Sequence, residues 1–137
     1  MIRDATFVDW PAVDRMARQF RDSAAPWIAY EPARFRRTFD ALVVQEHGCA
    51  LMLENGKGIL MAIALPSPFS GELVAQEIMW WIEPEARGRG REMLDAYETW
   101  ARAIGAMRCG VTCLDDRTAN LFARRGYERA ELAYRVY

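Results

Sequence analysis

The stretch that decides the fold is Glu77-Ile-Met-Trp-Trp-Ile-Glu-Pro-Glu-Ala-Arg-Gly-Arg-Gly-Arg-Glu-Met-Leu94. Its first half is an apolar, aromatic run that predicts a buried strand, and Pro84 ends that run. The arginines and glycines from Arg87 to Arg91 come next, and they open a segment whose apolar residues recur at helical spacing. A strand, a glycine-rich turn and a helix in this order present free backbone N–H groups to a phosphate. The stretch therefore predicts a site for a phosphorylated cofactor.

The composition of the chain limits its class. A chain of 137 residues is enough for one compact domain, residues 1–137, and too short for two. Apolar residues make up 52% and charged residues 27%, which is typical of a soluble globular protein. The net charge of −1 gives no global basic field for nucleic acid, and no apolar run approaches the roughly 20 residues that span a bilayer. With no secretory h-region at the N-terminus, we expect a cytoplasmic protein that binds neither nucleic acid nor membrane.

Histidine and cysteine are too few for most metal or nucleophile chemistry. The three cysteines, Cys49, Cys109 and Cys113, lack C-x-x-C spacing, and the chain has one histidine, His47. We therefore expect no metal site. A Ser-His-Asp or Cys-His mechanism would need His47, which lies between two expected elements, so this chemistry is disfavoured.

Hydrophobic periodicity and turn residues predict the secondary structure. Expected strands cover Ile2–Thr6, Cys49–Leu53, Ile59–Leu65, Leu73–Glu83, Met107–Leu114 and Tyr127–Tyr137, and expected helices begin after Asp9, at Pro32, after Arg91 and near Thr118. Asn55-Gly56 predicts a hairpin turn, Gly105 is placed to end the third helix, and Asp9 and Asp115 or Asp116 are placed to cap helices. The order β-α-α-β-β-β-α-β-α-β predicts an α/β domain with a mixed sheet, an antiparallel hairpin and a parallel crossover.

This order of elements, with Arg87-x-x-Gly90 joining the fourth strand to a helix, resembles the Gcn5-related N-acetyltransferase (GNAT) superfamily over nearly the whole chain. The central motif of that family is Arg/Gln-x-x-Gly-x-Gly/Ala. Here it is Arg87-Gly-Arg-Gly90-Arg-Glu92, so Glu92 replaces the final small residue. The stretch Asn120-Leu-Phe-Ala-Arg-Arg-Gly126-Tyr127 is similar to the family's Asn-x-Tyr-x-x-x-Gly-Phe segment, with Phe122 in place of the usual tyrosine. The sequence Trp80-Trp-Ile-Glu-Pro-Glu-Ala-Arg-Gly88 is also similar to that of short GNAT-like proteins of phages and prophages.

The resemblance implies a GNAT-like acyl-CoA N-acyltransferase fold and an acetyl-CoA-dependent N-acetyltransferase. Such an enzyme moves an acetyl group to a primary amine of an acceptor, here an unknown small molecule or protein, and members of the family often pair as homodimers. Phe122 and Glu92 depart from the family pattern and motivate an alternative. In that alternative the domain is catalytically weak or inactive and acts as an acyl-CoA-binding or protein-interaction module.

The expected cofactor site combines backbone and side-chain groups. Backbone N–H groups of Gly88–Glu92 are placed to bond a pyrophosphate, each charge-assisted bond contributing ~1.5–3 kcal/mol, and Gly88 and Gly90 let the backbone approach closely. Glu92 is unfavourable beside an anion unless it points away or pairs with an arginine. The resemblance adds that the pantetheine arm lies along an open backbone edge of the fourth strand and that a helical asparagine reaches the cofactor. The expected cofactor-binding residues are Trp81, Ile82, Arg87, Gly88, Arg89, Gly90, Arg91, Glu92 and Asn120.

Glu77 is the candidate general base. It interrupts an apolar strand, where a carboxylate is costly without a purpose, and its place is similar to that of a base glutamate in some family members. An exposed edge position or a salt bridge is the plainer interpretation of the same residue. Glu72 and Glu83 lie at the strand ends and are poorer candidates.

No residue is selected as the proton donor to the leaving thiolate, because Phe122 has no hydroxyl. The open candidates are Tyr30, Tyr127, Tyr134, Tyr137 and water. In the fold that the resemblance implies, the first helix and the loops 22–30 and 66–71 frame the acceptor pocket. Trp27, Tyr30 and Phe69 are candidates to line this pocket, or equally to close the core.

Overall fold

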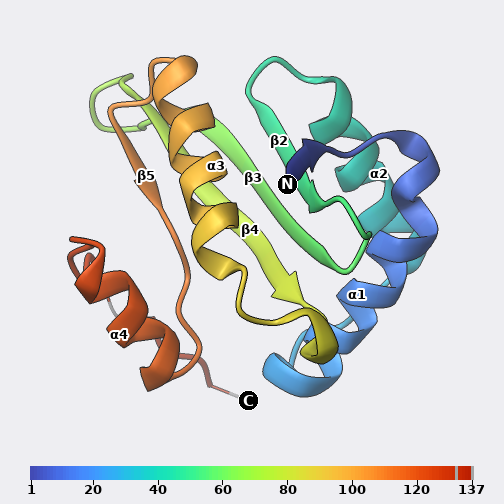
Figure 1. Ribbon diagram of the computed structural model, residues 1–137. Helices are drawn as coiled ribbons and strands as arrows, with labels where there is room; N and C mark the ends of the chain where they lie inside the picture. The colour runs from blue at the N-terminus through green and yellow to red at the C-terminus, as the bar shows by residue number, and fades with distance from the viewer. Residues whose placement is uncertain (132, 137) are drawn as a thin grey trace.

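The computed structural model of the protein describes residues 1–131 and 133–136. Its centre is a five-stranded sheet with the strands in chain order, β1-β2-β3-β4-β5 (Figure 1). The strands are β1 (Ile2–Asp4), β2 (Gly48–Leu53), β3 (Gly58–Pro66), β4 (Leu73–Ile82) and β5 (Arg108–Gly110). Neighbouring strands are antiparallel except for β4 and β5, which are parallel. The structure confirms the expected α/β fold with a mixed sheet.

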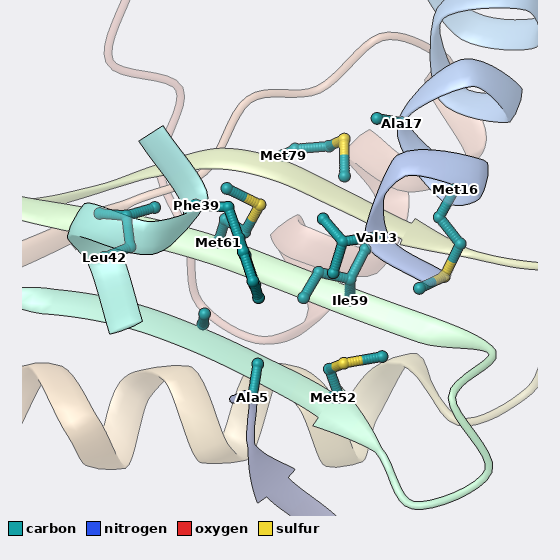
Figure 2. Close-up of a cluster of buried hydrophobic side chains, with 11 residues drawn as sticks. Ala5, Val13, Met16, Ala17, Phe39, Leu42, Met52, Ile59, Met61 and Met79 are labelled. Atoms are coloured by element: carbon teal, nitrogen blue, oxygen red, sulfur yellow. The ribbon is translucent and has the colours of Figure 1, made fainter. Parts of the chain in front are cut away.

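Four helices surround the sheet, and two short 3-10 turns join elements. The helices are α1 (Trp10–Ala24), α2 (Pro32–Val44), α3 (Gly90–Ala103) and α4 (Asp116–Arg124), and the turns are η1 (Phe7–Asp9) and η2 (Pro84–Ala86). Side chains of α1 and α2 pack on one face of the sheet, while α3 lies against the other face (Figures 1 and 2). None of the helices in the described ranges is long and apolar enough to cross a membrane.

The sheet separates two hydrophobic clusters. On β3, Ile59 and Met61 face α1 and α2, whereas Leu60 and Ala62 face α3. All four side chains are fully buried, which explains why this strand is an unbroken apolar run in the sequence. Figure 2 shows the first cluster, in which Met61 lies between the side chains of α1 and α2.

A β-bulge interrupts the pairing of β3 with β4. Met61 is opposite Met79 and Ala62 is opposite Glu77, so Ile78 is an extra residue on β4. A bulge bends its strand and increases the local twist. Because of the bulge, Glu77 lies on the α3 face of the sheet with Ala62, while Met79 lies in the cluster under α1 and α2.

The strands β4 and β5 diverge directly after they pair. Their parallel pairing runs only from Val74 opposite Arg108 to Gln76 opposite Gly110. Within the described chain, the edge of β4 from Glu77 to Ile82 therefore has no strand partner on the β5 side. The bulge at Ile78 follows the last paired residue and turns β4 away, which is why β5 is shorter than the expected strand 107–114.

Several local signals in the sequence are confirmed. Gly56 has a φ of +73° in the hairpin turn and Gly105 has a φ of +80° after α3, a region that favours glycine. The carboxylate of Asp115 caps α4 by accepting a hydrogen bond from Thr118 N at 2.7 Å. Asp9 holds the cap position of α1, but its carboxylate instead binds the Arg3 side chain and the Thr6 N–H.

The expected last strand, 127–137, is wrong for the part that the structure describes. Residues 127–131 and 133–136 form neither helix nor strand, and residues 132 and 137 lie outside the described residues. Of the described residues in this segment, all except Tyr127 are exposed rather than half-buried, and four are charged. Its neighbour β5 offers a pairing edge of only three residues, which is too short to direct a long ladder.

Candidate functional site

The start of α3 presents a row of free backbone donors. After η2 the chain turns at Gly88, where φ is +108°, and α3 begins at Gly90. Met93 N donates to Arg89 O at 3.4 Å. No backbone acceptor in the described ranges receives a hydrogen bond from the N–H groups of residues 88–92. A helix start of this kind attracts anions, because unpaired N–H groups and the helix dipole act together.

Acidic side chains already hold Arg89. Its guanidinium donates to both carboxylate oxygens of Glu92, at 3.1 and 2.9 Å, and to Glu54 at 2.8 Å. These bonds lower the pKa of Glu92 and bring that of Glu54 to about 2. The structure thus removes the objection that Glu92 raises, because the carboxylate pairs with an arginine. It also means that the charge of Arg89 is largely compensated.

The other two arginines of the turn differ in their surroundings. Arg87 Nε donates to Ile82 O at 3.1 Å, and its guanidinium carbon lies 4.8 Å from the centre of the Trp81 ring. Arg91 is exposed, and no acidic group of the described ranges forms a salt bridge with it. Within the described ranges neither Arg87 nor Arg91 is neutralised by an acidic group, but Arg87 is held against a backbone carbonyl and an aromatic ring, whereas Arg91 is exposed and forms no such contact.

Trp80 lies between the start of α3 and α4. A Cβ added to Gly90 would be 3.0 Å from Trp80 Cζ2, and the Trp80 ring centre is 5.8 Å from that of Phe122. The indole N–H of Trp80 is buried with no acceptor in the part of the chain that the structure describes. A side chain at position 90 would thus press on the Trp80 ring, and the free backbone donors of this turn suit an oxygen-rich anion such as a diphosphate.

The open backbone edge expected at the end of β4 is present, while the side chains of Trp81 and Ile82 pack in the hydrophobic core. Trp81 Nε1 donates to Gln19 Oε1 at 2.9 Å, and the Trp81 ring packs edge-on against Phe20. Ile82 packs on the cluster under α3. Asn120 is exposed on α4. Within the described ranges no hydrogen bond joins its side chain to residues 88–92. The expected role of Asn120 therefore remains a prediction.

Glu77 is a buried carboxyl group without a cationic partner in the described residues. Glu77 is only 8% exposed, and its Oε1 accepts a hydrogen bond from Thr112 N at 3.3 Å. Burial raises the pKa of Glu77 to about 7, against a smaller opposite effect of the Thr112 N–H. The other buried glutamate, Glu83, is instead held by Arg15 at 2.6 Å. Neither an exposed edge nor a salt bridge describes Glu77, and its pKa suits proton transfer near neutral pH.

Two of the tyrosines considered as proton donors already donate to carboxylates. Tyr127 donates to Glu98 at 3.0 Å and Tyr30 donates to Asp14 at 2.6 Å, and burial together with these carboxylates raises both pKa values. Tyr134 is 90% exposed, and Tyr137 lies outside the described residues. Phe122 is buried against Trp80 and Tyr127.

A cavity of about 280 Å³ lies on the other face of the sheet, and we refer to it as the helical cavity. It lies among α1, the loop that follows α1, α2 and the bulge of β4. Its lining consists of Ala17, Phe20, Arg21, Ile28, Ala29, Tyr30, Glu31, Arg34, Phe35, Thr38, Ile78 and Met79. The cavity therefore reaches the two residues that follow Glu77 in the chain.

The structure places the three aromatic residues expected at an acceptor pocket in different surroundings, and their role there stays a prediction. Tyr30 lines the helical cavity, but Trp27 does not, and the Arg135 guanidinium lies 3.8 Å from the Trp27 ring centre. The loop 66–71 borders a separate cavity of about 290 Å³, and its Phe69 is 98% exposed. This loop extends from the far ends of β3 and β4, away from α1 and α2.

Sequence reasoning missed three groups at these sites: the Thr112 N–H, the Trp80 indole N–H and the Arg34 side chain. Thr112 carries no signal, because its bond to Glu77 depends on how β5 and β4 diverge. The sequence does contain a signal for Arg34. It directly precedes the apolar Phe35 near the start of α2, so its side chain lies next to the face of the helix that packs on the sheet.

The open edge of β4 thus has the buried carboxyl group of Glu77 at one end and the free helix start of α3 at the other, an arrangement that suits an extended anionic ligand. Residues 10–127 match the Acetyltransferase (GNAT) family, and the chain belongs to that family. It is thus of the N-acetyltransferase class of enzymes.

Solved structures share the fold over the whole chain. A tetramutant of the BH1408 protein from Bacillus halodurans superposes with a TM-score of 0.81 at 17% identity, covering 100% of this chain and 99% of that one. The ribosomal-protein-alanine N-acetyltransferase from Brucella melitensis biovar Abortus 2308 gives 0.73 at 13% identity, with 100% and 99% covered. The aminoglycoside acetyltransferase meta-AAC0020 from an uncultured soil metagenomic sample gives 0.72 at 16% identity, with 100% and 93% covered. No curated protein matches the chain in sequence.

Proposed function

We propose that this protein transfers an acetyl group from acetyl-CoA to a primary amine. The observation that carries the proposal is the set of backbone N–H groups of residues 88–92, which find no acceptor in the described chain and lie at the end of the open edge of β4. In coenzyme A a diphosphate joins the adenosine part to an amide-containing arm that ends in the thiol. The helix start suits the diphosphate, and a strand edge suits the arm, because its amides can pair with free backbone groups.

Different residues of the site bind different parts of coenzyme A. The N–H groups of Gly88–Glu92 donate to the diphosphate, each such bond contributing ~1.5–3 kcal/mol, and the free charge of Arg91 adds to them. Trp81 and Ile82 contribute backbone groups rather than side chains, since their side chains pack in the core. Arg87 and Arg89 shape the turn through Ile82 O and Glu92.

Glu77 acts as the base. An acceptor amine with a pKa of ~10.4 must lose a proton before it attacks, and holding it neutral at pH 7 costs roughly 4.6 kcal/mol at 1.36 kcal/mol per pH unit. A carboxyl group with a pKa of about 7 is about half ionised there and takes that proton directly or through one water. The amine nitrogen then bonds to the acetyl carbon, the carbon–sulfur bond breaks, and the thiolate takes a proton from water.

The fold relatives support an amine as the acceptor. The names of two of them specify the alanine of a ribosomal protein and an aminoglycoside, and both kinds of acceptor carry amines. At 13% and 16% identity they share only the fold with this chain, so the choice between a small molecule and a protein rests on the site itself.

One observation favours a second function. Phe122 occupies the position of the family tyrosine and is buried between Trp80 and Tyr127, so no hydroxyl is available there. A domain that binds acyl-CoA without turnover would retain the helix start while lacking transfer activity.

Titration with coenzyme A, followed by thermal shift, tests the proposal. At a concentration of 100 times Kd the ligand adds about 2.7 kcal/mol, which raises Tm by on the order of 9 °C for a domain of this size. Arg91→Glu should remove most of this shift, while an acidic residue in the first turn leaves α3 stable. Arg37→Glu on α2 makes the same charge change at an exposed arginine that forms no salt bridge within the described ranges, and it should keep the full shift.

Release of free thiol from acetyl-CoA in the presence of amines separates the two functions. Thiol release in the wild type supports the transferase. A coenzyme A shift without thiol release across a broad amine panel supports the binding module. An equal shift in wild type and Arg91→Glu would place the diphosphate elsewhere and overturn the proposed site.

A further inference from the structure

The helical cavity has an apolar body and a charged rim. Phe20, Ile28, Phe35 and Met79 supply apolar walls. Phe35 also packs edge-on against the Tyr30 ring, with 5.6 Å between ring centres. These walls suit a ligand with an aromatic or branched aliphatic body.

The polar groups of the cavity are mostly paired with one another. Arg21 donates to Asp22 at 2.6 Å, and the Tyr30 hydroxyl donates to Asp14. Two charges remain, those of Arg34 and Glu31. Both residues are exposed, no salt bridge joins Arg34 to any acidic group of the described ranges, and the Glu31 side chain forms no capping bond with α2.

From this lining we infer that the acceptor is a small amino carboxylate, that is, a primary amine with an apolar body and a carboxylate that Arg34 binds. The inference rests on the proposed function and names its substrate class. An arginine binds a carboxylate through two parallel hydrogen bonds, and the guanidinium of Arg34 is the cation of this lining that no described partner satisfies. The apolar body then occupies the walls, and the amine points toward the bulge of β4.

The position of the cavity supports this orientation. Its floor includes Ile78 and Met79 of the bulge, where the edge of β4 no longer has a strand partner within the described chain. The Glu77 side chain lies on the opposite, α3 face of the sheet, so the amine approaches it across this open edge. Arg34 belongs to α2, a different element of the lining from the β4 bulge. A ligand that spans the cavity from Arg34 to the bulge places its carboxylate and its amine at opposite ends. A volume of about 280 Å³ suits a single amino acid better than a long chain or an oligosaccharide.

The same charges disfavour a polycationic acceptor. A polyamine or aminoglycoside brings several positive charges to a lining whose unpaired groups are one arginine and one exposed glutamate. Like charges within a few ångströms repel, and the repulsion grows in a partly desolvated cavity. Glu31 opposes the carboxylate of an amino acid in turn, so its removal should strengthen binding.

The test compares each amino acid with its decarboxylated counterpart. The probes are L-phenylalanine with 2-phenylethylamine and L-leucine with 3-methylbutylamine, with spermidine as the polycation, all at saturating acetyl-CoA. Arg34→Gln should lower kcat/KM for the two amino acids by about 10- to 100-fold, mainly through KM, and leave both plain amines unchanged. Comparing the same substrate between variants cancels the different basicities of the amines.

Two further variants complete the test. Glu31→Gln should change the amino acid rates in the opposite direction, toward higher kcat/KM, with no gain for the plain amines. Arg37→Gln, an exposed arginine on the same helix outside the cavity lining, should match the wild type with every probe. Circular dichroism confirms that each variant keeps its helices, since glutamine is a good helix former.

The inference is overturned when spermidine or a plain amine is the best substrate, or when Arg34→Gln affects an amino acid and its amine equally. A failure of the proposed function looks different, because no probe then releases thiol. In that case titration calorimetry of L-phenylalanine against wild type and Arg34→Gln, both with coenzyme A, still decides. Binding that weakens in Arg34→Gln supports the carboxylate site, and equal or absent binding overturns it.

Discussion

At the scale of single residues, Glu77 links stability to pH. Its pKa lies near 7 in the folded chain because of burial, against 4.5 as an ordinary value. Below pH 4.5 the group is neutral whether the chain is folded or not, and it carries no penalty. As the pH rises from 4.5 to 7 the unfolded chain ionises first, so the stability of the wild type falls, and above 7 the full cost of a buried charge is present.

Glu77→Gln removes this cost. The variant should therefore gain stability relative to the wild type between pH 4 and pH 8, by up to about 3 kcal/mol at 1.36 kcal/mol per pH unit. Urea denaturation of both proteins at several pH values measures the difference. Glu72→Gln, at an exposed glutamate, should show no such trend. A difference that stays constant with pH would contradict the raised pKa.

The same substitution should affect catalysis. Without a base, kcat/KM should fall by about 10²- to 10⁴-fold, and the rise of the wild-type rate through pH 7 should disappear. Raising the pH toward the pKa of the acceptor amine should narrow the gap, because the amine then loses its proton without help. A pH–rate profile of wild type and variant measures both effects, and a variant with the wild-type profile would assign the base to another group.

At the scale of elements, α2 and β2 meet at a glycine. A Cβ on Gly48 would lie 2.5 Å from Leu42 O and 2.7 Å from Leu42 Cα, both of them backbone atoms that cannot turn aside. Gly48→Ala should therefore separate α2 from the sheet and cost about 3 kcal/mol. Gly56→Ala is the matched change in the hairpin turn, where a Cβ meets nothing but φ is +73°, and it should cost only about 1–2 kcal/mol. Urea midpoints of the two variants check the order.

Elements with a strong local signal were predictable, and elements that depend on a partner were not. The helices α1, α2 and α3 carry apolar stripes, and the Asn55-Gly56 turn and the Asp115 cap are short-range features. By contrast, the length of β5 and the missing strand 127–137 depend on where β4 bends. The pattern of apolar residues in those two segments contains no information about the bulge at Ile78, which lies on another strand.

At the scale of the whole molecule, one sheet supports two cores. Leu60 and Met61 are adjacent on β3, are both fully buried, and face opposite clusters. Leu60→Ala and Met61→Ala should each cost about 2–5 kcal/mol. Because β2, β3 and β4 belong to both cores, tryptophan fluorescence and far-ultraviolet circular dichroism should report one shared transition in each variant. Transitions that separate in either variant would show that the two cores unfold independently.

The site was predictable where it is made of backbone and not where distant segments meet. The glycines and arginines of residues 87–91, which follow a strand and precede a helical pattern, predict the free helix start from the sequence alone. The pairing of Arg89 with Glu54 joins α3 to the hairpin after β2. The burial of Glu77 depends on α3 and the chain after β5. The helical cavity likewise exists only because α1 and α2 pack on the same face.

The bulge on β4 has a consequence for how this strand can change. Removing Ile78 would make Glu77 and Met79 consecutive, and both would keep the faces of the sheet that they occupy now, because Ala62 and Met61 opposite them are already consecutive. Every side chain before and after the deletion would retain its present neighbours. The register of β3 with β4 does not depend on this residue, and a shortened strand would form a straighter and more regular ladder. The deletion would remove the bend of β4 next to the point where its pairing with β5 ends, and we expect the two strands to pair over a greater length.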